Sequence, residues 1–274
     1  MVDLSVVLPM LGLLLVIGAF AGVIAGLLGV GGGIVLVPAF FYAFSAIGYG
    51  SPQLMQICLA TSLATIIVTS MRSLSSHNKK GAVDWPVLKQ WAPGIMIGAL
   101  VGVAVAAQLS STVLQGIFGG LGLLIGIYFI VGSDRWRIAD QMPGLITRSI
   151  LSPVVGVLSV LMGIGGGSFA VPIMTLYGAP IHRAVATASG FGLIIALPSV
   201  LAFLFVPIPE AVRPPFTIGA VNLPAFFITI ITTMYTATLG VRLAHAMDPK
   251  PLKRVFAVFL IAVALNMIRK SLGY

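Results

Sequence analysis

Long apolar segments are the feature that most constrains how this chain can fold. We distinguish ten of them, at roughly residues 5–30, 34–48, 57–71, 92–107, 113–132, 149–164, 168–178, 188–206, 222–240 and 254–272. Of the 274 residues, 59% are hydrophobic and only 8% are charged. A soluble domain of this length could not cover so much apolar surface with so few charges. The pattern therefore predicts an all-α polytopic membrane protein.

Several of these segments are short. A helix needs about 20 residues to cross the hydrocarbon core, and residues 168–178 would reach only about half its depth. Such a segment can be a short span or one arm of a re-entrant hairpin, and both arrangements leave the loops on the same sides. An eight-span arrangement would make residues 5–48 a single helix, which is about twice too long. We therefore prefer ten segments.

The basic residues are concentrated in four loops, at residues 72–91, 133–148, 179–187 and 241–254. These loops hold 12 of the 15 lysine and arginine residues. Because basic loops stay on the cytoplasmic side, we expect these four in the cytoplasm and both termini outside. These loop residues, which set the orientation, account for the net charge of +9. We therefore expect no nucleic-acid partner. The opening MVDLSVVLPM has no basic region before its apolar residues and is interpreted as the start of the first membrane segment.

Acidic residues are absent from the interior of the apolar segments. The six are Asp3, Asp84, Asp134, Asp140, Glu210 and Asp248, all in loops or at segment ends. Cation carriers commonly place a carboxylate within the membrane, so a cationic substrate is disfavoured. The single cysteine, Cys58, provides no disulfide framework. We find no motif for a catalytic nucleophile, a metal site or a cofactor, and therefore expect no enzymatic activity.

One glycine motif occurs twice. GVGGGIVLVP (29–38) is repeated as GIGGGSFAVP (163–172) at an offset of 134 residues, and GAVDWP (81–86) returns as GAVNLP (219–224) at an offset of 138. Matches in a fixed order at nearly constant offset indicate an internal duplication. Because each half has five segments, the halves must cross the membrane in opposite senses, as in transporters with inverted repeats. We assign 1–132 to the first repeat, 133–148 to a cytoplasmic linker and 149–274 to the second, inverted repeat.

The two glycine runs are predicted to form an anion site. Irregular backbone at membrane depth is tolerated only where protein buries it or where it lines a watery cavity. A helix that starts after each run would present unpaired N–H groups and the positive end of its dipole. The predicted site residues, meeting near the midplane, are Gly31, Gly32, Gly33, Gly165, Gly166, Gly167 and Ser168. Two alternatives stay open: the glycines can serve turns or helix packing, and Ser168 can cap its own helix.

Two threonines complete the predicted substrate path. Thr61, after Ala60, and Thr187, after Ala186, occupy similar places in the two halves. They interrupt apolar helices and could line a path for the substrate. The simpler alternative is that each hydroxyl bonds to its own backbone or to a neighbouring helix. Arg183 is interpreted as an anchor at the membrane interface.

These motifs resemble the sulfite exporter TauE/SafE family, also called the TSUP permeases, over essentially the whole chain. The paired glycine runs carry the resemblance, together with KGAVDWP (80–86) and LGVRLAHAMDPKPLKRVF (239–256). The resemblance implies a multi-pass transporter of the bacterial inner membrane. It implies sulfite or organosulfonates, such as sulfoacetate, as substrates.

We therefore expect a secondary transporter of small sulfur-containing anions that works by alternating access. Its expected partners are the anionic substrate and the lipid bilayer, and a homodimer is compatible with the sequence. An anion channel and a non-transporting membrane scaffold are the alternatives.

Overall fold

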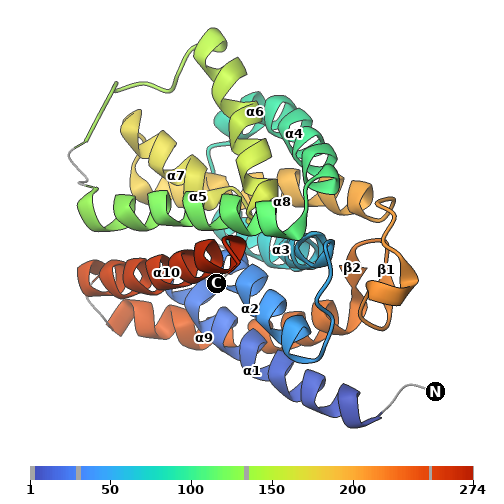
Figure 1. Cartoon of the computed structure of the whole chain (residues 1–274). Coiled ribbons are helices and arrows are strands. Elements are labelled where there is room, and N and C mark those ends of the chain that lie inside the picture. The colour runs from blue at the N-terminus through green and yellow to red at the C-terminus, as the bar shows by residue number, and fades with distance from the viewer. Residues whose placement is uncertain (1–3, 29–31, 133–135, 247–248, 274) are drawn as a thin grey trace.

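The computed structural model describes residues 4–28, 32–132, 136–246 and 249–273 (Figure 1). Within them the chain forms ten α-helices: α1 (Leu4–Leu28), α2 (Gly33–Ala46), α3 (Leu54–Lys79), α4 (Trp85–Gln108), α5 (Ser111–Val131), α6 (Leu145–Leu161), α7 (Gly167–Leu176), α8 (Ile181–Phe203), α9 (Leu223–Ala246) and α10 (Pro249–Ser271). Each corresponds to one apolar segment, so the prediction of a mostly helical chain with ten apolar segments is confirmed.

Some helices extend beyond their apolar segments. α3 continues through polar residues to Lys79, whereas the apolar segment ends near residue 71. α4 begins at Trp85, about two turns before the segment at 92–107. Its start is fixed by Asp84, whose side chain accepts a hydrogen bond from the Val87 N–H at 3.2 Å, and by Pro86 in the first turn. Apolar composition thus marks the part of a helix suited to lipid, while caps set its ends.

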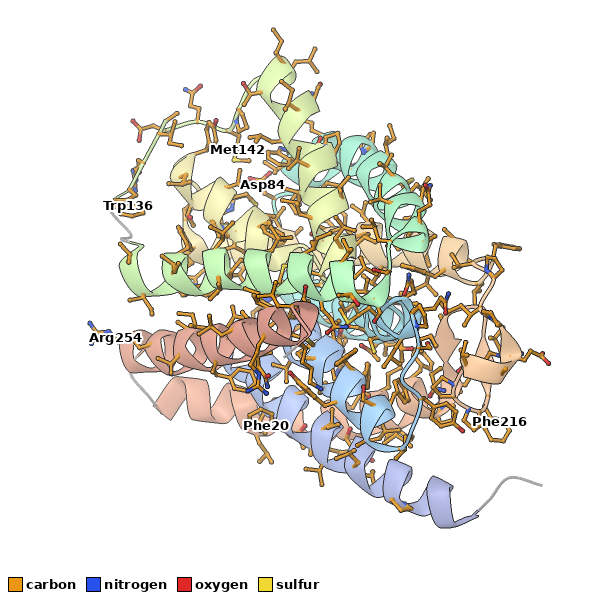
Figure 2. The ribbon with its side chains drawn as sticks, in the orientation of Figure 1. Phe20, Asp84, Trp136, Met142, Phe216 and Arg254 are labelled. Carbon is orange, nitrogen blue, oxygen red and sulfur yellow. The ribbon has the colours of Figure 1, made fainter. Side chains whose placement is uncertain are left out.

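The connection before α9 contains structure that the sequence analysis did not predict. A short 3₁₀ helix, η1 (Glu210–Val212), precedes two antiparallel strands, β1 (Thr217–Ile218) and β2 (Val221–Asn222). The Asn222 side chain donates to Thr217 Oγ1 and also accepts from the Ala225 N–H, both at 3.0 Å. The hairpin therefore ends on a residue that caps α9. Phe216 projects from this hairpin into the surroundings (Figure 2) and is exposed.

Three helix pairs each take one helix from the first half of the chain and one from the second. α1 packs along α9, α4 along α6, and α5 along α10, and Figure 1 shows these pairs around α3 and α8. α3 and α8 also pack against each other, and α3 is the most deeply buried of the long apolar helices. The centre of the molecule is therefore the contact between α3 and α8.

The surface of the outer helices suits lipid. Within the described residues, α3, α4, α5 and α8 are long and apolar enough to cross a membrane. Large apolar side chains such as Ile97, Leu124 and Phe227 are exposed on the outer helices. Exposed apolar surface on this scale is unsuited to water and is expected where lipid is the solvent. The fold therefore supports a membrane protein.

Candidate functional site

Each glycine run ends in the same backbone geometry. Gly32 and Gly166 are the N-cap residues of α2 and α7, with φ of 69° and 77°. This left-handed conformation is costly for residues with a Cβ atom, and glycine adopts it freely. The first helical bonds then form in the same way, from Val35 to the Gly32 carbonyl and from Phe169 to the Gly166 carbonyl. The expected helix starts after both runs are therefore present, while Gly31 lies outside the described residues.

The two runs meet in the middle of the molecule. A Cβ atom built on Gly33 would lie 2.6 Å from the Gly163 carbonyl oxygen and 3.1 Å from Ile164 Cα. Ile66, near the middle of α3, also packs against both Gly33 and Gly165. Gly192, at the centre of α8, lies against Gly165 on its other side. The structure therefore brings the runs together between the central helices, at a contact that admits no side chain on Gly33.

Several amide groups of the runs lack a partner. Among the described residues, no oxygen accepts from the N–H groups of Gly32, Gly33 and Ile34, or from those of Gly165–Ser168. All of these residues are buried except Gly167, which is half-buried. Buried amides are nearly always paired with protein, water or ligand. The arrangement supplies two helix N-termini whose donors are available to an anion.

Buried hydroxyl groups surround the second run. Ser62 of α3 donates to the Gly163 carbonyl at 2.8 Å and holds the turn in place. The hydroxyl groups of Ser159 and Ser168 are buried and have no hydrogen-bond partner in the part of the chain that the structure describes. Ser168 therefore does not cap α7 with its side chain, which removes that alternative role. Sequence reasoning passed over Ser159, although a serine in an apolar helix one turn before a glycine run was a usable signal.

The predicted threonines hold the starts of two helices. Thr61 Oγ1 accepts from the Asn222 N–H at 3.0 Å, and Thr187 Oγ1 accepts from the Asp84 N–H at 2.9 Å. Asn222 and Asp84 are the capping residues before α9 and α4. Each threonine thus has a structural bond to the opposite half of the chain. Contact of these threonines with substrate stays a prediction.

A cavity of about 130 Å³ lies where α4 and α8 begin. Its lining includes Asp84 and Arg183, whose side chains form an ion pair at 3.4 Å, and also Met142 from the segment before α6. Figure 2 shows Asp84 and Met142 close together. The Ile138 N–H donates to the Leu176 carbonyl at 2.8 Å, so this segment is tied to the end of α7. The cavity therefore lies beside the end of α7, the helix that starts at the second glycine run.

Charged groups are missing from the interior of the described structure. Every buried polar side chain there is neutral. No group of three or more histidine, cysteine or acidic residues that could hold a metal ion occurs among the described residues. The site therefore offers amide and hydroxyl donors without a cation.

The molecule has an apolar exterior and two helices that start at paired glycine runs in its interior. These features place it in the class of polytopic membrane proteins. The family model described as "Sulfite exporter TauE/SafE" matches residues 14–267. The chain therefore belongs to the TauE/SafE family, which confirms the resemblance seen in the sequence.

Similar proteins come from distant organisms. A probable membrane transporter protein of Haemophilus influenzae is 30% identical over 94% of this chain and 98% of its own length. One from Methanocaldococcus jannaschii is 26% identical over 95% of this chain and 96% of its own length. The Bacillus subtilis protein YunE, a probable membrane transporter, is 26% identical over 95% and 98%. No solved structure matches the chain. The family description names an exporter and the relatives are named as probable membrane transporters, so the chain belongs to a transporter family and not to an enzyme family.

Proposed function

We propose that this protein is a secondary transporter of small sulfur-containing anions, such as sulfite or organosulfonates including sulfoacetate, in the bacterial inner membrane. The observation that carries the proposal is the meeting of two helix N-termini with unpartnered, buried amides between α3 and α8. Such donors suit an oxyanion. The family name, sulfite exporter, suggests the chemical class of that anion.

Reciprocal contacts support an inverted repeat of residues 1–132 and 149–274. Asp84 and Asn222 are related by the 138-residue offset, and each donates its backbone N–H to a threonine of the other half. A Cβ atom on Gly126 would lie 3.5 Å from the Ala257 carbonyl oxygen, and one on Gly119 would lie 2.7 Å from the Ala264 carbonyl oxygen. Gly119 and Ala257 share the 138-residue offset, as do Gly126 and Ala264. Exchange of equivalent contacts is what a two-fold relation between halves produces.

Loop contacts support the proposed orientation. Residues of three loops assigned to the cytoplasm, Asp84, Asp140 and Arg183, line one cavity. Two loops assigned to the outside also meet, because the Ser111 N–H donates to the Pro52 carbonyl at 2.7 Å. Loops that should share a side therefore lie together.

Transport would proceed by alternating access around the glycine runs. The runs are closely packed against Ile66 and Ile195. A ligand can reach the amides only if the helices around them separate, first toward one side and then toward the other. This requirement favours a carrier over an open channel.

Transport into liposomes tests the proposal. Purified protein should give saturable uptake of labelled sulfite, with counterflow when the vesicles are preloaded with unlabelled sulfite. Uptake without saturation or counterflow would identify an anion channel. A protein that neither binds nor moves any sulfur oxyanion would be a scaffold, and the proposal would then be wrong.

A further inference from the structure

We propose that the site takes a singly charged oxyanion, held by the hydroxyl groups of Ser159 and Ser168 and by the amides of the second glycine run, and that it discriminates against doubly charged ions. The inference rests on the transport function proposed above and narrows its substrate.

The two hydroxyl groups are placed for this role. Ser159, in α6, has its Oγ atom 3.6 Å from the position that a Cβ atom would take on Gly166. Ser168 lies in the first turn of α7, directly after the unpartnered amides. Their exposed fractions are 0% and 3%, and neither hydroxyl has a hydrogen-bond partner among the described residues. An oxyanion at this helix start would satisfy hydroxyl and amide donors together.

The first half of the chain lacks these hydroxyl groups. At the 134-residue offset, Ile34 stands for Ser168 and Ala25 stands for Ser159. Ser70 of α3 lies on the side of the second run as well, with its Oγ atom 3.9 Å from the Cβ position of Gly165. Among the described residues, these buried hydroxyl groups lie at the second run, and we place the anion nearer to that run than to the first.

Among the described residues, no cationic side chain is buried near the second run. Among the described residues, the side chains found nearest to Gly163, Gly165 and Gly166 are Val37 of α2, Leu59, Ile66 and Ser70 of α3, Ser159 of α6, and Phe191 and Ile195 of α8. None of them is ionisable, and every buried polar side chain in the described residues is neutral.

A site built from neutral donors favours binding of a monoanion over binding of a dianion. The free energy of moving an ion out of water rises with the square of its charge, so a dianion costs about four times as much as a monoanion of equal size. Amides and hydroxyls stabilise the bound ion without cancelling its charge. The site should therefore prefer hydrogensulfite to sulfite, and a simple sulfonate to sulfate. Sulfoacetate, which carries a second charge on its carboxylate, is disfavoured among the proposed substrates.

A matched pair of ligands tests the charge preference. Methanesulfonate and sulfate have nearly the same size and tetrahedral shape, and differ in one negative charge. In calorimetric titrations of the purified full-length protein, methanesulfonate should bind with an affinity independent of pH around neutrality. Sulfate should bind more than about a hundredfold more weakly.

Sulfite adds an internal check, because its second ionisation lies near neutrality. Above that point its apparent affinity should weaken by about tenfold per pH unit, since the competent monoanion becomes a smaller fraction. Sulfate binding as tightly as methanesulfonate, or sulfite binding more tightly as pH rises, would overturn the charge preference while leaving anion transport standing. If none of the three ions binds, the proposed function itself fails, and this inference with it.

Serine variants test the donors. Ser159→Ala and Ser168→Ala should each weaken methanesulfonate binding by about ten- to a hundredfold. Because neither hydroxyl has a partner in the protein, neither change should lower the melting temperature without ligand. Ser152→Ala is the matched control, since Ser152 is buried in the same helix as Ser159 and already donates to the Arg148 carbonyl. Unchanged affinity in both test variants would remove the serines from the site.

Discussion

At the scale of single residues, glycine has two separate roles in this chain. Gly32 and Gly166 are needed for their positive φ, which lets a helix begin inside the molecule. Gly33 is needed for its missing side chain, because the Gly163 carbonyl oxygen occupies the space of a Cβ atom. In both roles no side chain covers the amides of the two glycine runs, and the proposed site depends on this.

Alanine at the helix starts should weaken anion binding. For Gly166→Ala we expect a loss of about ten- to a hundredfold in affinity, the value of a lost hydrogen bond to a charged partner. For Gly32→Ala we expect a smaller loss, because we place the anion nearer to the second run. The strained φ should also lower stability by about 1–2 kcal/mol. Affinity is therefore measured on the monodisperse fraction of each variant.

Gly48→Ala is the control for backbone strain. Gly48 has φ of 91° and open space around its Cβ position. This variant should lose the stability that a strained φ costs, without the added contact with Ile195 that Gly166→Ala would make, and should keep its affinity. If Gly32→Ala and Gly166→Ala behave like Gly48→Ala, the runs serve turns and packing, and the proposed site is wrong.

Carboxylates should not carry the coupling proton. Asp84→Asn should leave transport largely intact, because asparagine also caps a helix, as Asn222 does at α9. Glu210→Gln should leave transport unchanged as well, since the Glu210 side chain is exposed and, among the described residues, forms an ion pair with nearby Arg213 alone. Initial uptake rates at matched expression give the test. Loss of transport in either variant would point to a carboxylate relay.

At the scale of elements, close helix pairs depend on small residues at single positions. α5 packs on α10, where a Cβ atom on Gly119 would lie 2.5 Å from Ile268 Cγ1. The neighbouring Gly120 has nothing within 4 Å of its Cβ position. Small residues let membrane helices approach closely, because the hydrophobic effect gives little drive for helix association in lipid.

These two neighbours make a matched stability test. Gly119→Ala should destabilise the protein by about 1–3 kcal/mol through overpacking against α10. Gly120→Ala should be neutral or stabilising by up to about 1 kcal/mol, since alanine is the better helix former. Thermal unfolding in the same detergent compares them. Equal melting temperatures would mean that α5 and α10 are not held as closely as described.

At the scale of the whole molecule, the two halves exchange equivalent contacts, as the proposed inverted repeat would produce. Thr61 reaches Asn222 across the molecule, and Thr187 reaches Asp84. If the halves are inverted, these two bonds lie on opposite sides of the membrane. Motion of one half against the other would then strain one set of helix starts while relaxing the other, as alternating access requires.

Topology mapping tests the inversion. A reporter inserted beside Lys80 should be cytoplasmic, and one fused after Tyr274 should lie outside, because 12 of the 15 basic residues fall in the loops assigned to the cytoplasm. Periplasmic and cytoplasmic reporters are compared at each position. A cytoplasmic C-terminus would contradict the five-segment inverted repeat.

Much of the fold could be predicted from the sequence. Apolar runs locate the helices because lipid leaves the backbone no other way to satisfy its hydrogen bonds. The Gly-Gly-Gly runs indicate the helix breaks, because irregular backbone at membrane depth is tolerated only where protein or a watery cavity surrounds it. Helix ends such as Trp85 were missed, because capping by Asp84 decides them and hydropathy does not.

The sequence by itself determined the ten helices, their two breaks and the duplication, since these depend on local composition and on order along the chain. Only the tertiary structure decided which polar groups are free. Thr61 and Ser168 look alike in sequence, as single hydroxyls in apolar surroundings, but the Thr61 hydroxyl accepts from Asn222, while the Ser168 hydroxyl has no partner. A hydroxyl is available to a ligand only when nothing else in the fold bonds to it. That condition depends on residues more than a hundred positions away, which packing in three dimensions brings into contact.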